Sequence, residues 1–194
     1  MTRLCDISVP DDVVGRACDG DSRAQAQLYE LLSPAVFGLI RRLVGSRAVA
    51  EDLFQDTMMT VFGHLHVLRN RDALGAWVRQ IAVSRALMYL RSPWHRARLS
   101  LTPDTDEETG LPELSDTVSA PLAERYDLER ALASLSPTAR AVVWLYEVEG
   151  YTHEEIARAF GRSISFSKSQ LARAHRRLRE WFEPGSTRQP CTPI

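Results

Sequence analysis

The sequence contains little cysteine and no long apolar run. Cys5, Cys18 and Cys191 are odd in number and form no CxxC pair, so they support neither a disulfide framework nor a zinc site. The longest apolar stretches, residues 35–40 and 139–145, are far too short to span a bilayer. The N-terminal residues also lack the basic start and apolar core of a secretion signal. We therefore expect a cytoplasmic protein that does not insert into membranes.

The sequence also lacks the signatures of a catalytic site. No nucleophile elbow, phosphate-binding glycine loop or paired-histidine helix motif occurs in it. His64 and His66 have no neighbouring ligands at a spacing that would hold a metal ion. We therefore expect a protein that is not an enzyme, with no catalytic residue, cofactor, metal or small-molecule substrate.

The charged residues are segregated along the chain, although the formal net charge is only -1. Basic side chains outnumber acidic ones in residues 41–98, and acidic side chains dominate residues 99–128. Every charged side chain in residues 158–179 is positive. Because binding to nucleic acid depends on local patches rather than on the sum, the two basic segments are candidates for that role.

Apolar residues recur at spacings of three and four, and no alternating run is long enough to indicate a sheet. We therefore predict an all-α protein with two small helical domains, residues 1–95 and 121–183. Between them, residues 96–120 combine prolines with an acidic run, which predicts a flexible acidic linker. Residues 184–194 are rich in proline and are predicted to be a disordered tail.

Capping residues predict where the helices of the first domain begin and end. A short helix is expected near residues 11–17. Asp21 or Ser22 can begin the next helix, which Gly45 should end and Pro34 can bend. Its expected apolar face is Ala24, Leu28, Leu31, Leu32, Val36, Leu39, Ile40 and Leu43. Ser46 should cap a further helix, and Pro93 should terminate a third one after a polar turn at residues 69–72.

The second domain carries the pattern of a helix-turn-helix. Ser136 and Pro137 open a helix that Gly150 closes. Thr152 and Glu155 then fit a capping box, and a tight turn at residues 160–163 precedes a longer helix. The cations of that helix are Lys168, Arg173, Arg176, Arg177 and Arg179. They can reach phosphates or guanine edges from the major groove. The alternative is a solvated basic helix in an ordinary bundle.

Residues 50–57, Ala-Glu-Asp-Leu-Phe-Gln-Asp-Thr, resemble region 2.2 of the extracytoplasmic-function (ECF, group IV) RNA polymerase sigma factors. In that family this helix docks on the clamp coiled coil of the polymerase largest subunit. The resemblance implies a docking surface made by Glu51, Asp52, Gln55 and Asp56. Carboxylates and an amide suit an arginine-rich partner helix through charge-assisted hydrogen bonds. The alternative is an acidic face that only meets solvent.

Residues 76–82, Ala-Trp-Val-Arg-Gln-Ile-Ala, resemble regions 2.3 to 2.4 of the family, where a basic helix lies along the melted -10 element. Residues 64–72 would form the rim of a pocket for flipped bases. The implied -10 contacts are Arg69, Arg71, Trp77, Arg79, Ser84, Arg85 and Arg91, with Trp77 mainly stabilising the core. Ser84 and Met88 stand where the family usually has asparagine and aspartate, so the preferred bases are not implied.

Residues 132–140 and 151–157 resemble regions 4.1 and 4.2, which recognise the -35 element. The implied -35 contacts are Arg162, Ser163, Ser165, Phe166, Lys168, Ser169, Gln170, Arg173, Arg176 and Arg177. The residues from Ser165 to Ser167 depart from the Gly-Thr-Val start that is usual in the family. Phe166 could contact a thymine methyl group or pack inward, and the sequence leaves both open.

The resemblance implies a transcription initiation factor that binds the clamp coiled coil and flap of core RNA polymerase. It would direct the polymerase to -35 and -10 promoter elements, assist promoter melting and be controlled by an anti-sigma factor. The acidic linker would thread toward the active-site cleft, unless it is a passive tether. Two alternatives stay open: a helix-turn-helix regulator that acts without polymerase, and a sigma-like interaction protein.

Overall fold

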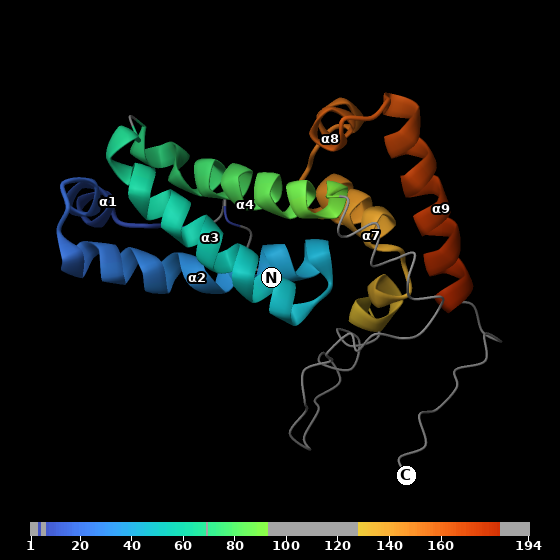
Figure 1. Ribbon diagram of the computed structural model, residues 1–194, viewed down its shortest axis with the longest axis horizontal. Helices are drawn as coiled ribbons and strands as arrows, with labels where there is room; N and C mark the ends of the chain where they lie inside the picture. Colours follow the sequence, from blue (N-terminus) through green and yellow to red (C-terminus); the bar gives the residue numbers. More distant parts are fainter. Residues whose placement is uncertain (1–3, 5–6, 69, 93–127, 183–194) are drawn as a thin grey trace, which may run out of the picture. The chain divides into compact units, whose positions relative to one another are not determined.

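The computed structural model describes Leu4 and residues 7–68, 70–92 and 128–182. Within these ranges the regular secondary structure is helical and no strand occurs (Figure 1). The chain divides into two compact units, Met1–Pro112 and Glu113–Ile194. The prediction of an all-α protein with two helical domains is therefore confirmed. The predicted linker, residues 96–120, and the predicted tail, residues 184–194, lie outside the described residues.

Within the described residues of the first unit, four α-helices pack around one core. They are α1 (Asp11–Cys18), α2 (Ser22–Val44), α3 (Arg47–His64) and α4 (Leu74–Arg91). The helices α2, α3 and α4 contact one another in pairs, and α1 packs on α2 (Figure 1). Two single-turn 3-10 helices, η2 (Leu65–Val67) and η3 (Arg71–Ala73), join α3 to α4 where the sequence predicted a polar turn. Large side chains with almost no exposure fill this core: Leu28, Leu32, Val36, Ile40, Leu43, Val61, Leu65, Val78 and Leu87.

The ends of α2 follow from residues that satisfy its unpaired backbone groups. The side chain of Asp21 accepts hydrogen bonds from the backbone N–H of Arg23 at 2.9 Å and of Ala24 at 3.4 Å. Gly45 follows the last turn with φ 82°, a conformation that favours glycine, and its N–H donates to Arg41. Of the two predicted caps, Asp21 rather than Ser22 is therefore used.

One predicted core residue of α2 lies at the surface. Leu31 is 39% exposed, whereas Leu28 and Leu32 are fully buried. The buried stripe continues through Val36 and Ile40, at the spacing of about four residues that one face of a helix requires. Leu31 falls at the edge of this stripe, so including it in the apolar face was wrong. The helix also continues through Pro34, which is exposed.

The second unit begins with a helical segment at residues 128–133. It continues with α7 (Pro137–Val143), a π-helical turn η4 (Trp144–Val148), α8 (His153–Phe160) and α9 (Ile164–Phe182). The sequence predicted an uninterrupted helix up to Gly150, and the structure replaces its last turn with the π turn. There the N–H of Glu149 donates to the carbonyl of Trp144, and the Glu149 carboxylate accepts from the indole N–H of Trp144 at 3.2 Å.

The capping box predicted for α8 is present. The backbone N–H of Thr152 donates to the Glu155 carboxylate at 2.8 Å, and the N–H of Glu155 donates to the Thr152 hydroxyl at 3.2 Å. Gly161 ends the helix in the left-handed conformation, with φ 61°. These two ends fix the turn between α8 and α9, and therefore the direction in which α9 leaves.

Replacing Thr152 by alanine should destabilise the second unit by about 1 kcal/mol, because one backbone donor at the start of α8 loses its acceptor. Hydrogen exchange of the α8 amides in the full chain measures the effect. Thr152→Ser keeps the hydroxyl and is the matched control, which should exchange like the parent protein. Equal exchange in the alanine and serine variants would contradict a stabilising role for the capping box.

Candidate functional site

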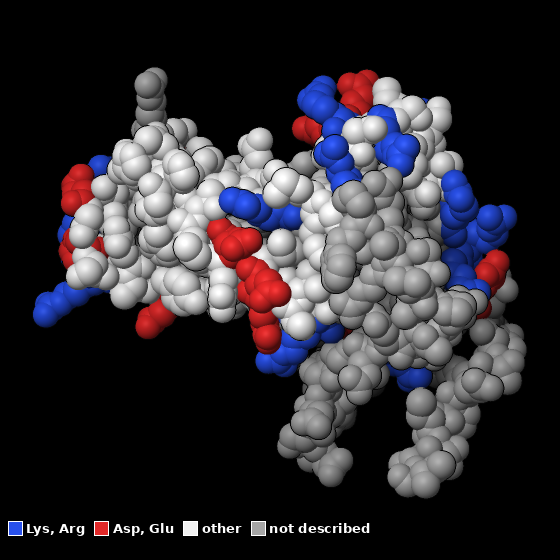
Figure 2. Space-filling model, in the orientation of Figure 1, with Lys and Arg blue, Asp and Glu red and all other residues white. Residues whose placement is uncertain are grey.

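The first candidate surface is the acidic face of α3. Its four residues, Glu51, Asp52, Gln55 and Asp56, are all exposed. They lie on the side of the helix away from its buried residues. Glu51 and Gln55 are four residues apart, as are Asp52 and Asp56, so the four side chains form two adjacent rows along the helix. Figure 2 shows acidic side chains gathered along α3. Glu51 also pairs with Arg47, whose Nε lies 2.9 Å from its carboxylate, and both partners are exposed.

An aromatic cluster holds this helix against α2. The ring of Phe54 meets Tyr29 edge-on at 6.1 Å and Phe37 at 5.9 Å, and Phe62 lies 6.3 Å from Tyr29. Tyr29 and Met59 are exposed, Met59 at 75%, so apolar surface borders the acidic face. This cluster was not predicted from the sequence. The available signal was the pair Phe54 and Phe62, eight residues apart and therefore on one row of positions four residues apart along α3.

The predicted -10 residues differ in how accessible they are. Arg71, Ser84 and Arg91 are exposed, whereas Trp77, Arg79 and Arg85 are half-buried. The guanidinium of Arg85 donates to the hydroxyl of Thr60 at 2.9 Å and thereby links α4 to α3. Arg69 lies outside the described residues. The three exposed residues are the members of this set that are most accessible to a partner.

The second candidate surface is the exposed side of α9 and the turn before it. Figure 2 shows basic side chains gathered along α9. The exposed predicted -35 residues are Arg162, Ser163, Ser165, Lys168, Arg173, Arg176 and Arg177. Ser169 and Gln170 are half-buried. The Ser169 hydroxyl donates to the carbonyl of Phe166 at 2.9 Å and accepts from the Arg173 guanidinium at 3.3 Å, so it orders the cation beside it.

Phe166 takes the inward position of the two that the sequence left open. Its ring is half-buried, and its centroid lies 5.7 Å from that of Phe160 on α8. Its backbone N–H donates to the hydroxyl of Ser163 at 3.3 Å, which caps the first turn of α9. Phe166 therefore helps to set the angle between the two helices of the turn.

Two histidines connect the helices around α9. The ring of His153 stacks on Tyr146 at 4.5 Å, and its Nδ1 lies 3.0 Å from the hydroxyl of Ser167, which is fully buried. The Nε2 of His175 lies 3.0 Å from the carboxylate of Glu147. His153 thus links α8 to α9 and to η4, and His175 links α9 to η4.

Within the described ranges, no three histidine, cysteine or acidic side chains gather where they could hold a metal ion. In the same part of the chain, none of the helices is both long and apolar enough to cross a bilayer.

Comparison with known protein families gives a separate family match for each unit. Residues 28–96 match the family described as Sigma-70 region 2, and residues 125–178 match Sigma-70, region 4. The acidic face of α3 thus lies in the first match and the basic side of α9 in the second.

Curated relatives cover both units. The ECF RNA polymerase sigma factor SigE of Mycolicibacterium smegmatis is 30% identical in an alignment of 181 positions that covers 87% of this chain and 66% of that protein. RNA polymerase sigma factor CarQ of Myxococcus xanthus is 31% identical over 84% of this chain and 91% of its own length. The ECF RNA polymerase sigma factor SigL of Mycobacterium tuberculosis is 31% identical over 86% of this chain and 93% of its own length.

A solved structure resembles the fold as well. The sigma factor RpoE from Bartonella quintana, in complex with the anti-sigma factor NepR, matches with a TM-score of 0.54 and 26% sequence identity. The match covers 80% of this chain and 94% of that one.

Proposed function

The chain belongs to the ECF RNA polymerase sigma factors, and we propose that it binds core RNA polymerase and directs it to promoters with -35 and -10 elements. It assists promoter melting by binding alone and performs no chemistry. The observation that carries the proposal is the exposure of two oppositely charged helix faces, α3 and α9, in the units that match regions 2 and 4. We further propose that the protein belongs to group IV of the sigma factors and acts in the cytoplasm.

The acidic face of α3 is the proposed contact with polymerase. Asp52, Gln55 and Asp56 present carboxylates and an amide on one exposed side, which suits the cations of a coiled-coil helix in the largest-subunit clamp. The aromatic packing of Phe54 on α2 holds α3 in place, so little ordering is needed on binding. The flap of the polymerase is the proposed contact of the second unit.

The promoter contacts are divided between the units. We propose that the exposed residues of η3 and α4 bind the melted -10 strand, and that the N-terminal half of α9 enters the major groove of the -35 duplex. Lys168 and Arg173 are the cations best placed for the duplex, because both are exposed and Arg173 is ordered by Ser169. Phe166, which packs on Phe160, is not among the proposed contacts.

We further propose control by an anti-sigma factor. The support is the solved sigma factor from Bartonella quintana, which is similar over most of this chain and is bound to the anti-sigma factor NepR. A regulator of this kind would act by covering the surfaces that polymerase or DNA needs.

Reconstitution with purified core RNA polymerase tests the proposal. The chain should form a stoichiometric complex with the core enzyme, and this holoenzyme should select promoter fragments from genomic DNA and give run-off transcripts from them. A helix-turn-helix regulator that acts without polymerase would bind DNA but form no complex with the core enzyme. A sigma-like interaction protein would form a complex but give no transcript. Either of these results would overturn the proposed function.

A further inference from the structure

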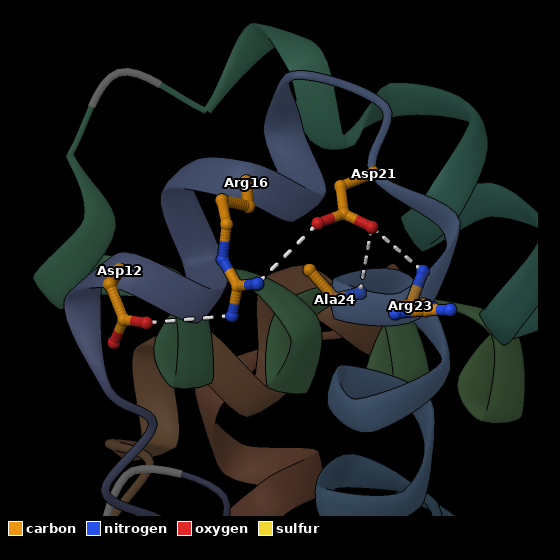
Figure 3. Close-up of polar contacts among 5 residues, drawn as sticks. All are labelled: Asp12, Arg16, Asp21, Arg23 and Ala24. Carbon is orange, nitrogen blue, oxygen red and sulfur yellow. Dashed lines mark hydrogen bonds and ion pairs between the residues drawn. The ribbon is translucent and has the colours of Figure 1, made fainter.

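The short helix α1 is firmly attached to the start of α2. Arg16 reaches both Asp12 and Asp21 at 3.5 Å, and Asp21 is the residue that caps α2 (Figure 3). The side chain of Gln25 donates to the carbonyl of Ala17 at 3.1 Å. The apolar side of α1, which includes Val13, Val14 and Ala17, is buried. Several contacts of different kinds therefore fix the position of α1.

The same helix contacts the segment between α3 and α4. The thiol of Cys18 donates to the carbonyl of Leu65 in η2 at 3.4 Å, and α1 also contacts η3. The contact with η3 involves Gly15, which is buried. A Cβ at Gly15 would lie 2.8 Å from Nη1, 3.0 Å from Cζ and 3.1 Å from Nη2 of Arg71. The guanidinium of Arg71 thus lies against the backbone of α1, in the space that the Cβ of any other residue at position 15 would occupy.

We propose that α1 positions the guanidinium of Arg71 for contact with the -10 strand, and that Gly15 leaves the room in which this guanidinium lies. The inference rests on the proposed function and names a residue that the resemblance did not. Arg71 is an exposed residue although its guanidinium lies against α1. In the proposal, a phosphate or a base meets the side of the guanidinium that faces away from α1. A long side chain that is already ordered loses less conformational entropy when DNA binds.

The variant Gly15→Ala distinguishes a role of α1 in positioning Arg71 from a role in packing the first unit. The added methyl group moves the guanidinium, which is the end of a flexible side chain, so the fold should tolerate it. Alanine also favours a helix more than glycine does, and thermal stability should therefore stay equal or rise. The matched control is Gly63→Ala in α3, where a Cβ would meet no atom within 4 Å.

The measurement uses holoenzyme and a fluorescent single-stranded oligonucleotide with the non-template -10 sequence of a promoter that the parent holoenzyme selects. We expect Gly15→Ala to weaken binding about threefold to tenfold, and Gly63→Ala to leave it unchanged. Permanganate reactivity of the melted thymines should fall in the same variant. In an Arg71→Ala background, Gly15→Ala should have no further effect, because the group that it displaces is gone.

The outcomes distinguish this inference from the proposed function. If the parent chain fails to bind core polymerase or to open a promoter, the proposed function itself fails. If the parent chain opens the promoter and Gly15→Ala binds the oligonucleotide equally well, the proposal that Gly15 positions Arg71 is overturned. An equal loss in the presence and absence of the Arg71 side chain would also overturn it, because the effect would then come from packing of α1.

Discussion

A chain that carries Asp52→Lys and Asp56→Lys should no longer bind core RNA polymerase, while its helical content stays unchanged. Both side chains are exposed on α3 and neither contributes to the core, so reversing their charge leaves the packing intact. At the interface the new lysines would face the cations of the partner helix. Like charges at close range, together with the loss of charge-assisted hydrogen bonds, should lower the affinity roughly 100-fold or more.

Titration of labelled core enzyme with each variant gives the affinity, and circular dichroism gives the helical content. The matched control is Asp19→Lys with Glu30→Lys, which makes the same change in net charge at two exposed positions outside the acidic face of α3. The control should bind like the parent chain. Tight binding by the Asp52 and Asp56 variant would place the polymerase contact elsewhere on the protein.

Replacing Lys168 and Arg173 by alanine should have the second largest effect. The holoenzyme should lose at least about tenfold in affinity for a -35 duplex, since a cation that contacts guanine contributes about 1–3 kcal/mol. The dependence of log affinity on log salt concentration should also become flatter, by about 0.9 for each phosphate contact that is lost. Both side chains are exposed on α9, so the fold should not change.

The measurement is a salt series on duplex DNA with the -35 sequence of the selected promoter. Arg130→Ala is the control, because this arginine is exposed in the same unit but precedes the helix-turn-helix. It should leave both affinity and slope near the values of the parent chain. If the Lys168 and Arg173 variant kept the parent slope, α9 would not be the element that meets the phosphates.

The ends of the helices were predictable because capping is a local interaction. Asp21 meets donors two and three residues away, and Thr152 and Glu155 satisfy each other across one turn. Gly161 adopts a backbone conformation that other residues rarely do. All of these signals lie within a few residues of each other, so reading the chain in order was sufficient to find them.

The charged faces were predictable for a related reason. Helical periodicity places Glu51, Asp52, Gln55 and Asp56 on one side of α3 whatever the helix packs against. The exposure of Lys168 and Arg173 on α9 follows in the same way from the buried positions of Leu171 and Ala174. Which DNA bases or polymerase residues these faces contact is not a property of one helix, and their roles stay predictions.

The chain alone thus specified where most helices lie and the side of each helix that carries charge, because both depend on neighbours within about four residues. It did not specify the π turn that follows α7. It could not specify which side chains meet across helices. The contact of Arg71 with Gly15, the hydrogen bond from Cys18 to Leu65 and the pairing of His153 with Ser167 join residues far apart in sequence. Those pairs exist only once packing has brought the helices together, since close packing selects one partner for each buried surface.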